Sequence, residues 1–495
     1  MTSVKLGSEA DFERVRQLLL QSDYTSNRVV ERFDLPTLGY FDDDFDRAQI
    51  SPWHDSAVGI LIRLFIELHR VDEQAARQHL DDDSLTALQS LGLLTLEDGM
   101  FSATSALYPT GGVWIASDLW QRPDRQPFHP GQDVVYSALV ANAFRFLTFM
   151  PRLPAEAALD LCCGTGVAAL SAAKQFAQQA YATDIAERSI QYAEFNRRLN
   201  GLENVTLGVG DLYEPVRGKT FDRIYVHPPY VPVLRPKYIY HDGGEDGESI
   251  SRRIVTDLPQ YLRPGGMLYM LAMLTDREQP TEQRLRQWLG ESAEEFDVTF
   301  WTVWTRTPEE YAVQAGTRSP TPLEDIKAFK EMFDRHGVKS LAYGNVYIQR
   351  HRQPREAFTI RRNLGQNTGP ADIRRVIQLE TLRREPGGYE QILNSRVSAN
   401  LDTELRVHHK LTAQGWEPGS NLLITTDPFP MEARVDLWAP YLLAVCLESQ
   451  TKTVREIFRE LQEQDVLPQK ADPIEFAQAL SVLVSGGFLS LEIIQ

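Results

Sequence analysis

The chain has 495 residues, 42% of them hydrophobic, and a formal net charge of −17. This length predicts two to four domains, and the lack of an apolar run of eighteen residues argues against a membrane span. The acidic balance disfavours binding to a phosphate backbone, so nucleic acid is not an expected partner. Three cysteines are too few for a disulfide framework or a zinc site, which favours a reducing, cytoplasmic location and predicts no metal.

Residues 1–125 predict an N-terminal, mostly helical module. Apolar residues recur at helical spacing over Asp11–Gln21 and Ala57–Leu68, and an Asp-Gly turn within Gly92–Phe101 is typical of a β-hairpin. Helices followed by such a hairpin predict a winged-helix-like fold. We expect a cap or dimerisation element, with substrate or nucleic-acid recognition as the alternative.

Residues 126–354 predict an α/β core domain, in which strand-like runs alternate with helical segments as in a parallel, Rossmann-like sheet. The seven expected strands are Leu159–Cys162, Gln179–Asp184, Val205–Val209, Phe221–His227, Gly266–Met273, Asp297–Val303 and Asn345–Arg350. Residues 355–495 predict a second winged-helix-like module, with amphipathic helices over 454–464 and 473–483. A homodimer formed through the two flanking modules is a further expectation.

The stretch Ala157–Ala173 combines an apolar run, an acidic residue (Asp160), a turn through Gly164, Thr165 and Gly166, and a helical segment. A strand, tight turn and helix start in this order build a nucleotide-type pocket in α/β sheets. The spacing also satisfies the dinucleotide fingerprint, so a dinucleotide stays open on this motif alone. A carboxylate beside the turn would repel a pyrophosphate but suits a ligand with an amine and a sulfonium, which indicates S-adenosyl-L-methionine.

Acidic residues also end the second and third predicted strands. Asp184 follows the glycine turn at about the twenty-residue spacing at which a carboxylate takes ribose hydroxyls, although a helix N-cap is a compatible structural role. Asp211 is placed to accept a hydrogen bond from the adenine amine while Leu212 packs on the ring. A simple turn-forming role for Asp211 is the alternative.

The fourth predicted strand ends in His227-Pro228-Pro229-Tyr230. Prolines lack an N–H, so this loop presents main-chain carbonyls to an amine or amide. The Tyr230 ring offers a face to a planar group or a cation. A strand-terminating turn is the alternative interpretation.

The glycine loop with Asp160, then Asp184, Asp211 and the Pro-Pro-Tyr loop follow one another along the chain. In this order they resemble the motifs of the class I S-adenosylmethionine-dependent methyltransferases. Over residues 126–350 the chain resembles, more narrowly, the HemK-like release-factor glutamine methyltransferases, whose fourth-strand motif reads Asn-Pro-Pro-Tyr. The segments His241–Gly247 and Leu262–Gly266 support this resemblance. It implies that Asp160, Cys162, Gly164, Thr165, Gly166, Asp184, Ile185, Asp211, Leu212 and His227 bind the cofactor, and that His227, Pro228 and Tyr230 are catalytic.

Two positions depart from the family pattern: His227 replaces the usual Asn, and Cys162 replaces the first glycine of the loop. Neutral His227 can accept from an amide N–H, but it can also act as a general base, which opens hydroxyl, carboxyl, amine and imidazole acceptors. We therefore expect methyl transfer to a nitrogen or oxygen of a protein, peptide or peptide-like small molecule. An RNA or DNA base N-methyltransferase and a non-catalytic scaffold are the alternatives.

Overall fold

The computed structural model describes residues 4–40, 56–124, 126, 130–436, 438–448 and 451–493. Its contacts divide the chain into two compact units: unit 1 comprises Met1–Val298 and Thr305–Arg352, and unit 2 comprises Thr299–Trp304 and Gln353–Gln495. Within the described ranges, no helix has the length and apolar character needed to cross a membrane.

The N-terminal part of unit 1 combines helices and short strands, with more helical than strand residues in its described ranges. Its elements are α1 (Glu9–Gln21), α2 (Ser26–Phe33), α3 (Ala57–Phe65), β1 (Val71–Asp72), α4 (Glu73–His79), α5 (Asp82–Ser90), β2 (Leu94–Glu97), β3 (Met100–Ala103), β4 (Ala106–Thr110) and β5 (Val113–Ser117). The predicted helices correspond to α1 and α3, and the predicted hairpin is formed by β2 and β3. A capping box between Ser8 and Asp11 fixes the start of α1. Strands β1, β3 and β2 form one antiparallel sheet and β4 pairs with β5.

A large sheet forms the centre of the chain. Its elements, with the helices between them, are α6 (Ala141–Phe149), β6 (Ala155–Leu161), α7 (Val167–Gln175), β7 (Ala177–Asp184), α8 (Glu187–Leu199), β8 (Val205–Val209), β9 (Phe221–Val226), α9 (Ser249–Tyr261), β10 (Leu262–Asp276), α10 (Thr281–Trp288), β11 (Phe296–Arg306), α11 (Pro308–Gly316), α12 (Pro322–Arg335), β12 (Ser340–Arg350) and β13 (Thr359–Asn363). Among the described residues the strand order is β13-β11-β12-β10-β9-β6-β7-β8. All seven predicted strands are present.

The eighth strand of this sheet, β13, was not predicted. Its sequence, Thr-Ile-Arg-Arg-Asn, lacks the apolar alternation that identifies a strand. Together with the middle of β11, β13 belongs to unit 2.

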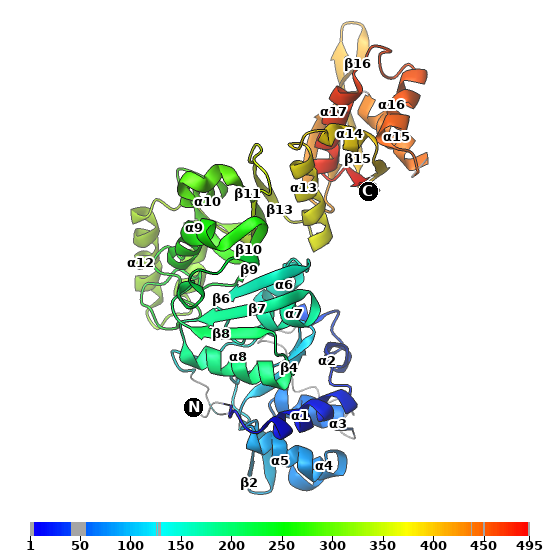
Figure 1. The fold of residues 1–495 in the computed structure, drawn as a ribbon. Helices are drawn as coiled ribbons and strands as arrows, with labels where there is room; N and C mark the ends of the chain where they lie inside the picture. The colour runs from blue at the N-terminus through cyan, green and yellow to red at the C-terminus, as the bar shows by residue number, and fades with distance from the viewer. Residues whose placement is uncertain are drawn as a thin grey trace. The chain divides into compact units, whose positions relative to one another are not determined.

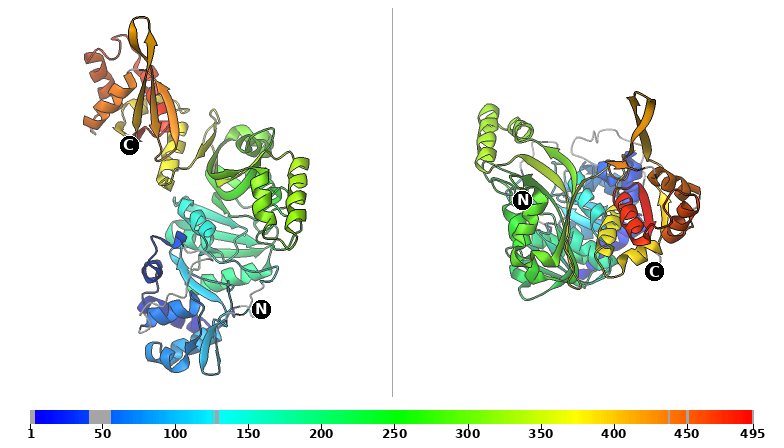
Figure 2. Two further views of the ribbon diagram at one scale, coloured as in Figure 1. Left: turned by 180° about the vertical axis from the view of Figure 1, so that it is seen from behind. Right: turned by 90° about the horizontal axis from the view of Figure 1, so that it is seen from above.

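Strands β8, β7, β6, β9 and β10 run parallel, whereas β12 is antiparallel to β10. The parallel register pairs Asp160 with Ala182 and Tyr225, and Asp184 with Val209. The carboxyl ends of these strands therefore open at one edge of the sheet (Figure 1), where ligands of open α/β sheets bind. Helices α11 and α12 pack together at the periphery of unit 1 (Figure 2), with Tyr311 against Phe329 and Phe333.

The rest of unit 2 contains α13 (Pro370–Leu382), α14 (Gly388–Leu393), β14 (Arg396–Ala399), β15 (Glu404–Thr412), β16 (Gly415–Thr425), β17 (Met431–Val435), α15 (Trp438–Glu448), α16 (Val454–Glu463), α17 (Pro473–Ser485) and β18 (Leu489–Glu492). The predicted helices over 454–464 and 473–483 correspond to α16 and α17. Their apolar faces share one core with α13, α14 and α15. Strands β15 and β16 form a hairpin that stands out from the rest of this unit (Figure 2).

Candidate active site

The glycine loop joins the end of β6 to the start of α7. Cys162, Gly164 and Gly166 have φ angles of +56°, +52° and +77°, in the left-handed region that costs a non-glycine residue about 1 kcal/mol. A Cβ on Gly166 would lie 3.0 Å from the Cβ of Ala193 on α8, so this glycine permits close helix packing. A Cβ on Gly164 would have no described atom within 4 Å, so bare main chain faces open space where a ligand can lie.

Asp160 is buried beneath this loop, 3% exposed. Its carboxylate accepts a hydrogen bond from the Ala169 N–H at 3.1 Å, in the first turn of α7. Burial raises the pKa of Asp160 well above its usual value. This raised pKa weakens the repulsion between Asp160 and a pyrophosphate that the sequence predicted. The Asp160 side chain nevertheless accepts the hydrogen bond of a main-chain N–H at the N-terminus of α7, and a pyrophosphate would need that N–H group.

Asp184 links the second strand to the glycine loop. Its two carboxylate oxygens accept hydrogen bonds from the N–H groups of Gly164 and Ala186, each at 2.9 Å. Burial raises the pKa of this carboxyl above its usual value. The next residue, Ile185, is 58% exposed although it is a large apolar side chain. An exposed apolar surface beside a fixed carboxylate is suited to a ligand that carries a planar ring and hydroxyls.

Asp211 makes an ion pair that the sequence did not predict. Its Oδ2 lies 2.5 Å from Nη2 of Arg253 on α9. Leu212 follows in the left-handed region, with φ of +50°, and its carbonyl accepts a hydrogen bond from the Thr183 hydroxyl at 3.0 Å. The proposed contacts of Asp211 and Leu212 with adenine stay predictions.

The three acidic residues converge on Cys162. Burial raises the pKa of the Cys162 thiol well above its usual value, and the negative charges of Asp184, Asp160 and Asp211 raise it further. The thiol is therefore protonated and unreactive at neutral pH. Because burial raises the pKa of Asp160 and Asp184, and Asp211 pairs with Arg253, this side of the site offers carboxyl groups as hydrogen-bonding partners rather than a large unpaired negative charge.

His227 stands at the end of β9 between two rings. Its imidazole stacks on Phe146 of α6 at 5.3 Å between ring centroids and on Tyr230 at 5.7 Å. Burial alone lowers the pKa of His227 to about 4. The imidazole is thus neutral at pH 7 and too weak a base to take a proton efficiently, whereas it can accept a hydrogen bond.

The Tyr230 hydroxyl is held by a network that joins three elements. Nδ2 of Asn142, on α6, donates to the Tyr230 hydroxyl at 3.1 Å, and Oδ1 of Asn142 accepts from the Tyr343 hydroxyl, on β12, at 2.9 Å. Burial raises the pKa of Tyr230 to about 12, so its hydroxyl stays protonated. Asn142 therefore fixes the position of the Tyr230 ring.

The segment Gly243–Gly247 supports the Pro-Pro-Tyr loop from behind. The Val231 carbonyl accepts from the Gly243 N–H at 2.9 Å, and the Gly244 carbonyl accepts from the Val233 N–H at 3.1 Å. A Cβ on Gly243 would lie 2.8 Å from Tyr230 Cα, and one on Gly247 would lie 2.5 Å from the Tyr230 carbonyl oxygen. Glycine is required here because the two segments touch through their main chains.

Comparison with known proteins places this geometry in a family. The Methyltransferase small domain model matches residues 127–301. A protein from Methanocaldococcus jannaschii, named as a protein N5-glutamine methyltransferase, is 34% identical over 134 residues, which are 26% of this chain and 67% of that protein. The chain belongs to the HemK-like class I methyltransferases.

Two further relatives of this HemK-like methyltransferase match over the same core. The release factor glutamine methyltransferase of Thermodesulfovibrio yellowstonii is 34% identical over 23% of this chain. The ribosomal protein uL3 glutamine methyltransferase of Bradyrhizobium diazoefficiens is 40% identical, also over 23% of this chain. The matches span 44% and 39% of these two proteins.

In this HemK-like methyltransferase, the residues predicted from the sequence lie at the ends of β6, β7, β8 and β9. Thr165 and Pro228 are buried, and the Thr165 carbonyl accepts from the Asn196 amide at 3.0 Å. Sequence reasoning missed Asn142, Tyr343 and Arg253 as members of the site. Only Arg253 had a local signal, since it lies between His241–Gly247 and Leu262–Gly266, the two segments that support the family resemblance. No cluster of three His, Cys, Asp or Glu side chains suited to a metal occurs in the described part of the chain.

Proposed function

We propose that this HemK-like methyltransferase transfers a methyl group from S-adenosyl-L-methionine to a nitrogen of a protein, with the side-chain amide of glutamine as the acceptor. One observation carries the proposal: the carboxyl groups beside the glycine loop and the neutral His227 before the Pro-Pro-Tyr loop lie at the ends of neighbouring strands. The names of the relatives, which include release factor and ribosomal protein uL3 glutamine methyltransferases, support the same acceptor.

The residues around the glycine loop fit this cofactor. Open space beside Gly164 admits a ligand against bare main chain, and Ile185 and Val209, 58% and 49% exposed, offer apolar surface to a planar base. Asp184 and Asp211 supply acceptors for hydroxyls and an amine. When bound, the cofactor supplies an electrophilic methyl group on a sulfonium.

The acceptor loop fits a neutral amide better than a charged amine. Pro228 and Pro229 lack N–H groups, so the main chain there offers carbonyl acceptors, and neutral His227 adds a ring nitrogen. Burial lowers the pKa of His227 to about 4, so its ring is neutral and adds no charge to this side of the site. The amide N–H groups of glutamine would donate to these acceptors, which aligns its nitrogen for in-line attack.

A labelling experiment tests the proposal. The full chain is incubated with methyl-labelled cofactor and a purified release factor or ribosomal protein uL3, and mass spectrometry then locates the label. We expect the label on one glutamine amide, and its loss with His227→Ala at unchanged cofactor affinity. Label on a hydroxyl or on a lysine amine would contradict the proposal.

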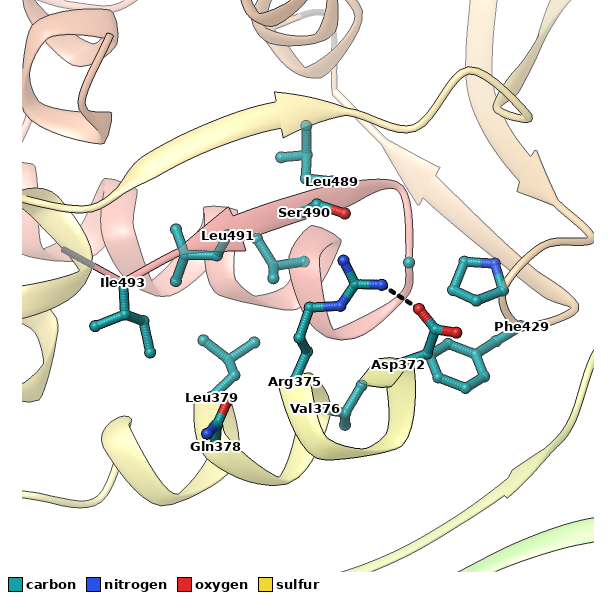
Figure 3. Close-up of a pocket in the computed structure, with 13 residues that line it drawn as sticks. Asp372, Arg375, Val376, Gln378, Leu379, Phe429, Leu489, Ser490, Leu491 and Ile493 are labelled. Atoms are coloured by element: carbon teal, nitrogen blue, oxygen red, sulfur yellow. Dashed lines mark hydrogen bonds and ion pairs between the residues drawn. The ribbon is translucent and has the colours of Figure 1, made fainter. Parts of the chain in front are cut away.

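Methylation of a nucleic-acid base is less well supported. The sequence feature in its favour is the number of arginines between Arg350 and Arg375. In the structure, however, Arg350 pairs with Glu295 and Arg375 with Asp372 (Figure 3). A 30-nucleotide RNA is the probe, and we expect no salt-sensitive binding at micromolar concentration. Calorimetry with the cofactor tests separately whether the chain is a catalytically inactive scaffold. An enzyme should bind the cofactor, and Asp184→Ala should weaken that binding, whereas a scaffold should show no binding.

We also propose three domains, over residues 1–125, 126–354 and 355–495, with winged-helix-like flanks in a cytoplasmic protein. In support, α3, β1, α4, α5, β2 and β3 follow each other in winged-helix order, with sheet order β1-β3-β2. In unit 2, β14 pairs with β18, and α16 and α17 lie between these two strands in the chain. Substrate recognition or homodimerisation are the roles we propose for these flanks.

A further inference from the structure

One edge of strand β5 is covered by side chains of a helix. Among the described strands, β5 pairs only with β4. On its other edge, the Trp114 N–H donates to Oδ1 of Asn200 at 3.0 Å, and the Trp114 carbonyl accepts from Nδ2 of Asn200 at 2.7 Å. Ala116 makes the same pair of hydrogen bonds with Asn196, at 2.7 Å and 3.0 Å. Both asparagines lie on α8, so their amide groups take the place of a neighbouring strand.

The spacing of the four residues explains this match. Asn196 and Asn200 are four positions apart on α8, which is about 6 Å along a helix. Trp114 and Ala116 are two positions apart on β5, which is about 6.7 Å along a strand. Alternate residues of a strand present their N–H and C=O groups to the same edge, so each asparagine meets one of them. The N-terminal module is thus held to the large sheet by a regular set of hydrogen bonds.

The hairpin of β4 and β5 also contacts α7, the helix that follows the glycine loop. The Gly111 carbonyl, in the turn between the two strands, accepts from the Ser171 hydroxyl and from Nε2 of Gln175, each at 2.7 Å. The hairpin therefore contacts both helices against which the glycine loop is built.

Asn196 differs from Asn200 in one hydrogen bond, which reaches the glycine loop. Its Nδ2 also donates to the Thr165 carbonyl at 3.0 Å, whereas Nδ2 of Asn200 donates to the Asn196 carbonyl at 2.9 Å. Asn196 is fully buried and Thr165 is 3% exposed. Removal of the Asn196 amide would therefore take a donor away from a buried acceptor, which is costly.

α8 supports the glycine loop at a second point. A Cβ on Gly166 would lie 3.0 Å from the Cβ of Ala193, one turn before Asn196 on the same helix. Gly164, on the other side of Thr165, faces open space. The loop thus rests on α8 through Thr165 and Gly166 while Gly164 presents its main chain to a ligand.

We propose that Asn196 is a positioning residue for the cofactor, and that through it the β4–β5 hairpin of the N-terminal module holds the glycine loop in place. The module then has a role besides substrate recognition or dimerisation. That S-adenosyl-L-methionine lies beside Gly164 rests on the proposed function, whereas the contact that holds the loop does not.

Asn196→Ala and Asn200→Ala in the full chain form a matched pair. Each variant removes two hydrogen bonds to β5, so each should lower the melting temperature. Asn196→Ala also takes the donor from the Thr165 carbonyl, and calorimetry with S-adenosyl-L-methionine should show binding weakened about tenfold. Asn200→Ala does not touch the loop, and the affinity should stay within about twofold of the wild type.

A second pair, Asn196→Asp and Asn200→Asp, guards against misfolding caused by a lost side chain. Aspartate has the shape of asparagine and still accepts from the N–H of β5, but a carboxylate donates no hydrogen bond. The cofactor affinity should again fall only for the variant at position 196. With an acceptor identified by labelling, that variant should raise KM for the cofactor and leave kcat unchanged, because the loop binds the cofactor equally before and during transfer.

Hydrogen exchange of the ligand-free chains separates positioning of the loop from a general loss of stability. The N–H groups of Cys163, Gly164 and Gly166 are hydrogen-bonded. The peptide that contains them should exchange several-fold faster in Asn196→Ala than in Asn200→Ala.

Equal loss of cofactor affinity in the two alanine variants, or equal exchange of the loop peptide, would overturn the inference, because Asn196 would then act only on stability. A wild type that binds no cofactor would contradict the proposed function instead. In that case the exchange comparison would still decide whether Asn196 positions the loop.

Discussion

At the scale of single residues, His227 stands where the resemblance to the HemK-like family leads us to expect an Asn. An Asn in its place would be neutral at every accessible pH, whereas the histidine stays neutral well into the acidic range because its position beside Phe146 and Tyr230 lowers its pKa. Its lowered pKa of about 4 gives it the Asn-like role of a hydrogen-bond acceptor. The substitution therefore preserves the chemistry of the loop near neutral pH and makes it sensitive to acid.

This burial predicts a pH-dependent stability. An unfolded histidine has a pKa of about 6.5, so between pH 6.5 and 4 the unfolded chain binds a proton that the folded chain does not. The contribution of His227 to the free energy of unfolding is complete above pH 6.5 and falls as the pH is lowered, by about 2 kcal/mol at pH 5. Urea unfolding at pH 7.5 and pH 5 should show this loss in the wild type and a smaller one in His227→Gln. Equal losses in both would show that the imidazole is not buried.

The two glycines of the loop allow a matched comparison. Both have left-handed φ, so alanine at either costs about 1 kcal/mol of backbone strain. Gly164→Ala adds its methyl group to the open space beside the loop and should weaken cofactor binding at least tenfold in calorimetry. Gly166→Ala instead meets Ala193 and should mainly lower the melting temperature. The reverse pattern would place the cofactor on the other side of the loop.

At the scale of elements, the sheet was predictable and the cross-links between its elements were not. Apolar runs that end in Asp160, Asp184 or His227 identify strands and their open ends from local sequence. Asn142 and Tyr343, by contrast, lie 201 residues apart and meet only because β12 folds back beside β10. The low pKa of His227 was also not predictable from local sequence, because Phe146, whose ring stacks on the imidazole, lies on α6, far from His227 in the chain.

Because the segment Gly243–Gly247 contacts the Pro-Pro-Tyr loop, we expect a substitution in this segment to lower the catalytic rate without weakening cofactor binding. A methyl group at Gly247 would press on the Tyr230 carbonyl and displace the acceptor loop. Because small displacements of a reacting group are costly, Gly247→Ala should lower kcat at least tenfold at unchanged cofactor affinity. Gly290→Ala is the control, since its φ of +61° carries the same strain but a Cβ there would contact no described atom within 4 Å. Equal kcat in the two variants would mean that the segment does not position the loop.

At the scale of the whole molecule, the boundary between the two units does not fall at a simple linker. Residues Thr299–Trp304, in the middle of β11, group with unit 2 although the ends of that strand belong to unit 1. Trp301 is fully buried, and its ring lies 5.3 Å from that of Phe429. A strand shared in this way means that a cut after residue 352 removes contacts from the large sheet itself.

We therefore expect a chain ending at Arg352 to bind the cofactor but to be less stable than the full chain. The proposed cofactor residues, from Asp160 to His227, all lie within unit 1, so calorimetry should give an affinity within about threefold of the full chain. The melting temperature should fall, because Trp301 loses Phe429 and the loss of an aromatic contact partner in a core costs about 3 kcal/mol or more. Phe429→Ala in the full chain isolates this contact and should reproduce part of the drop. If the truncated chain melts like the full protein, β11 does not depend on unit 2, and the two units are separable domains.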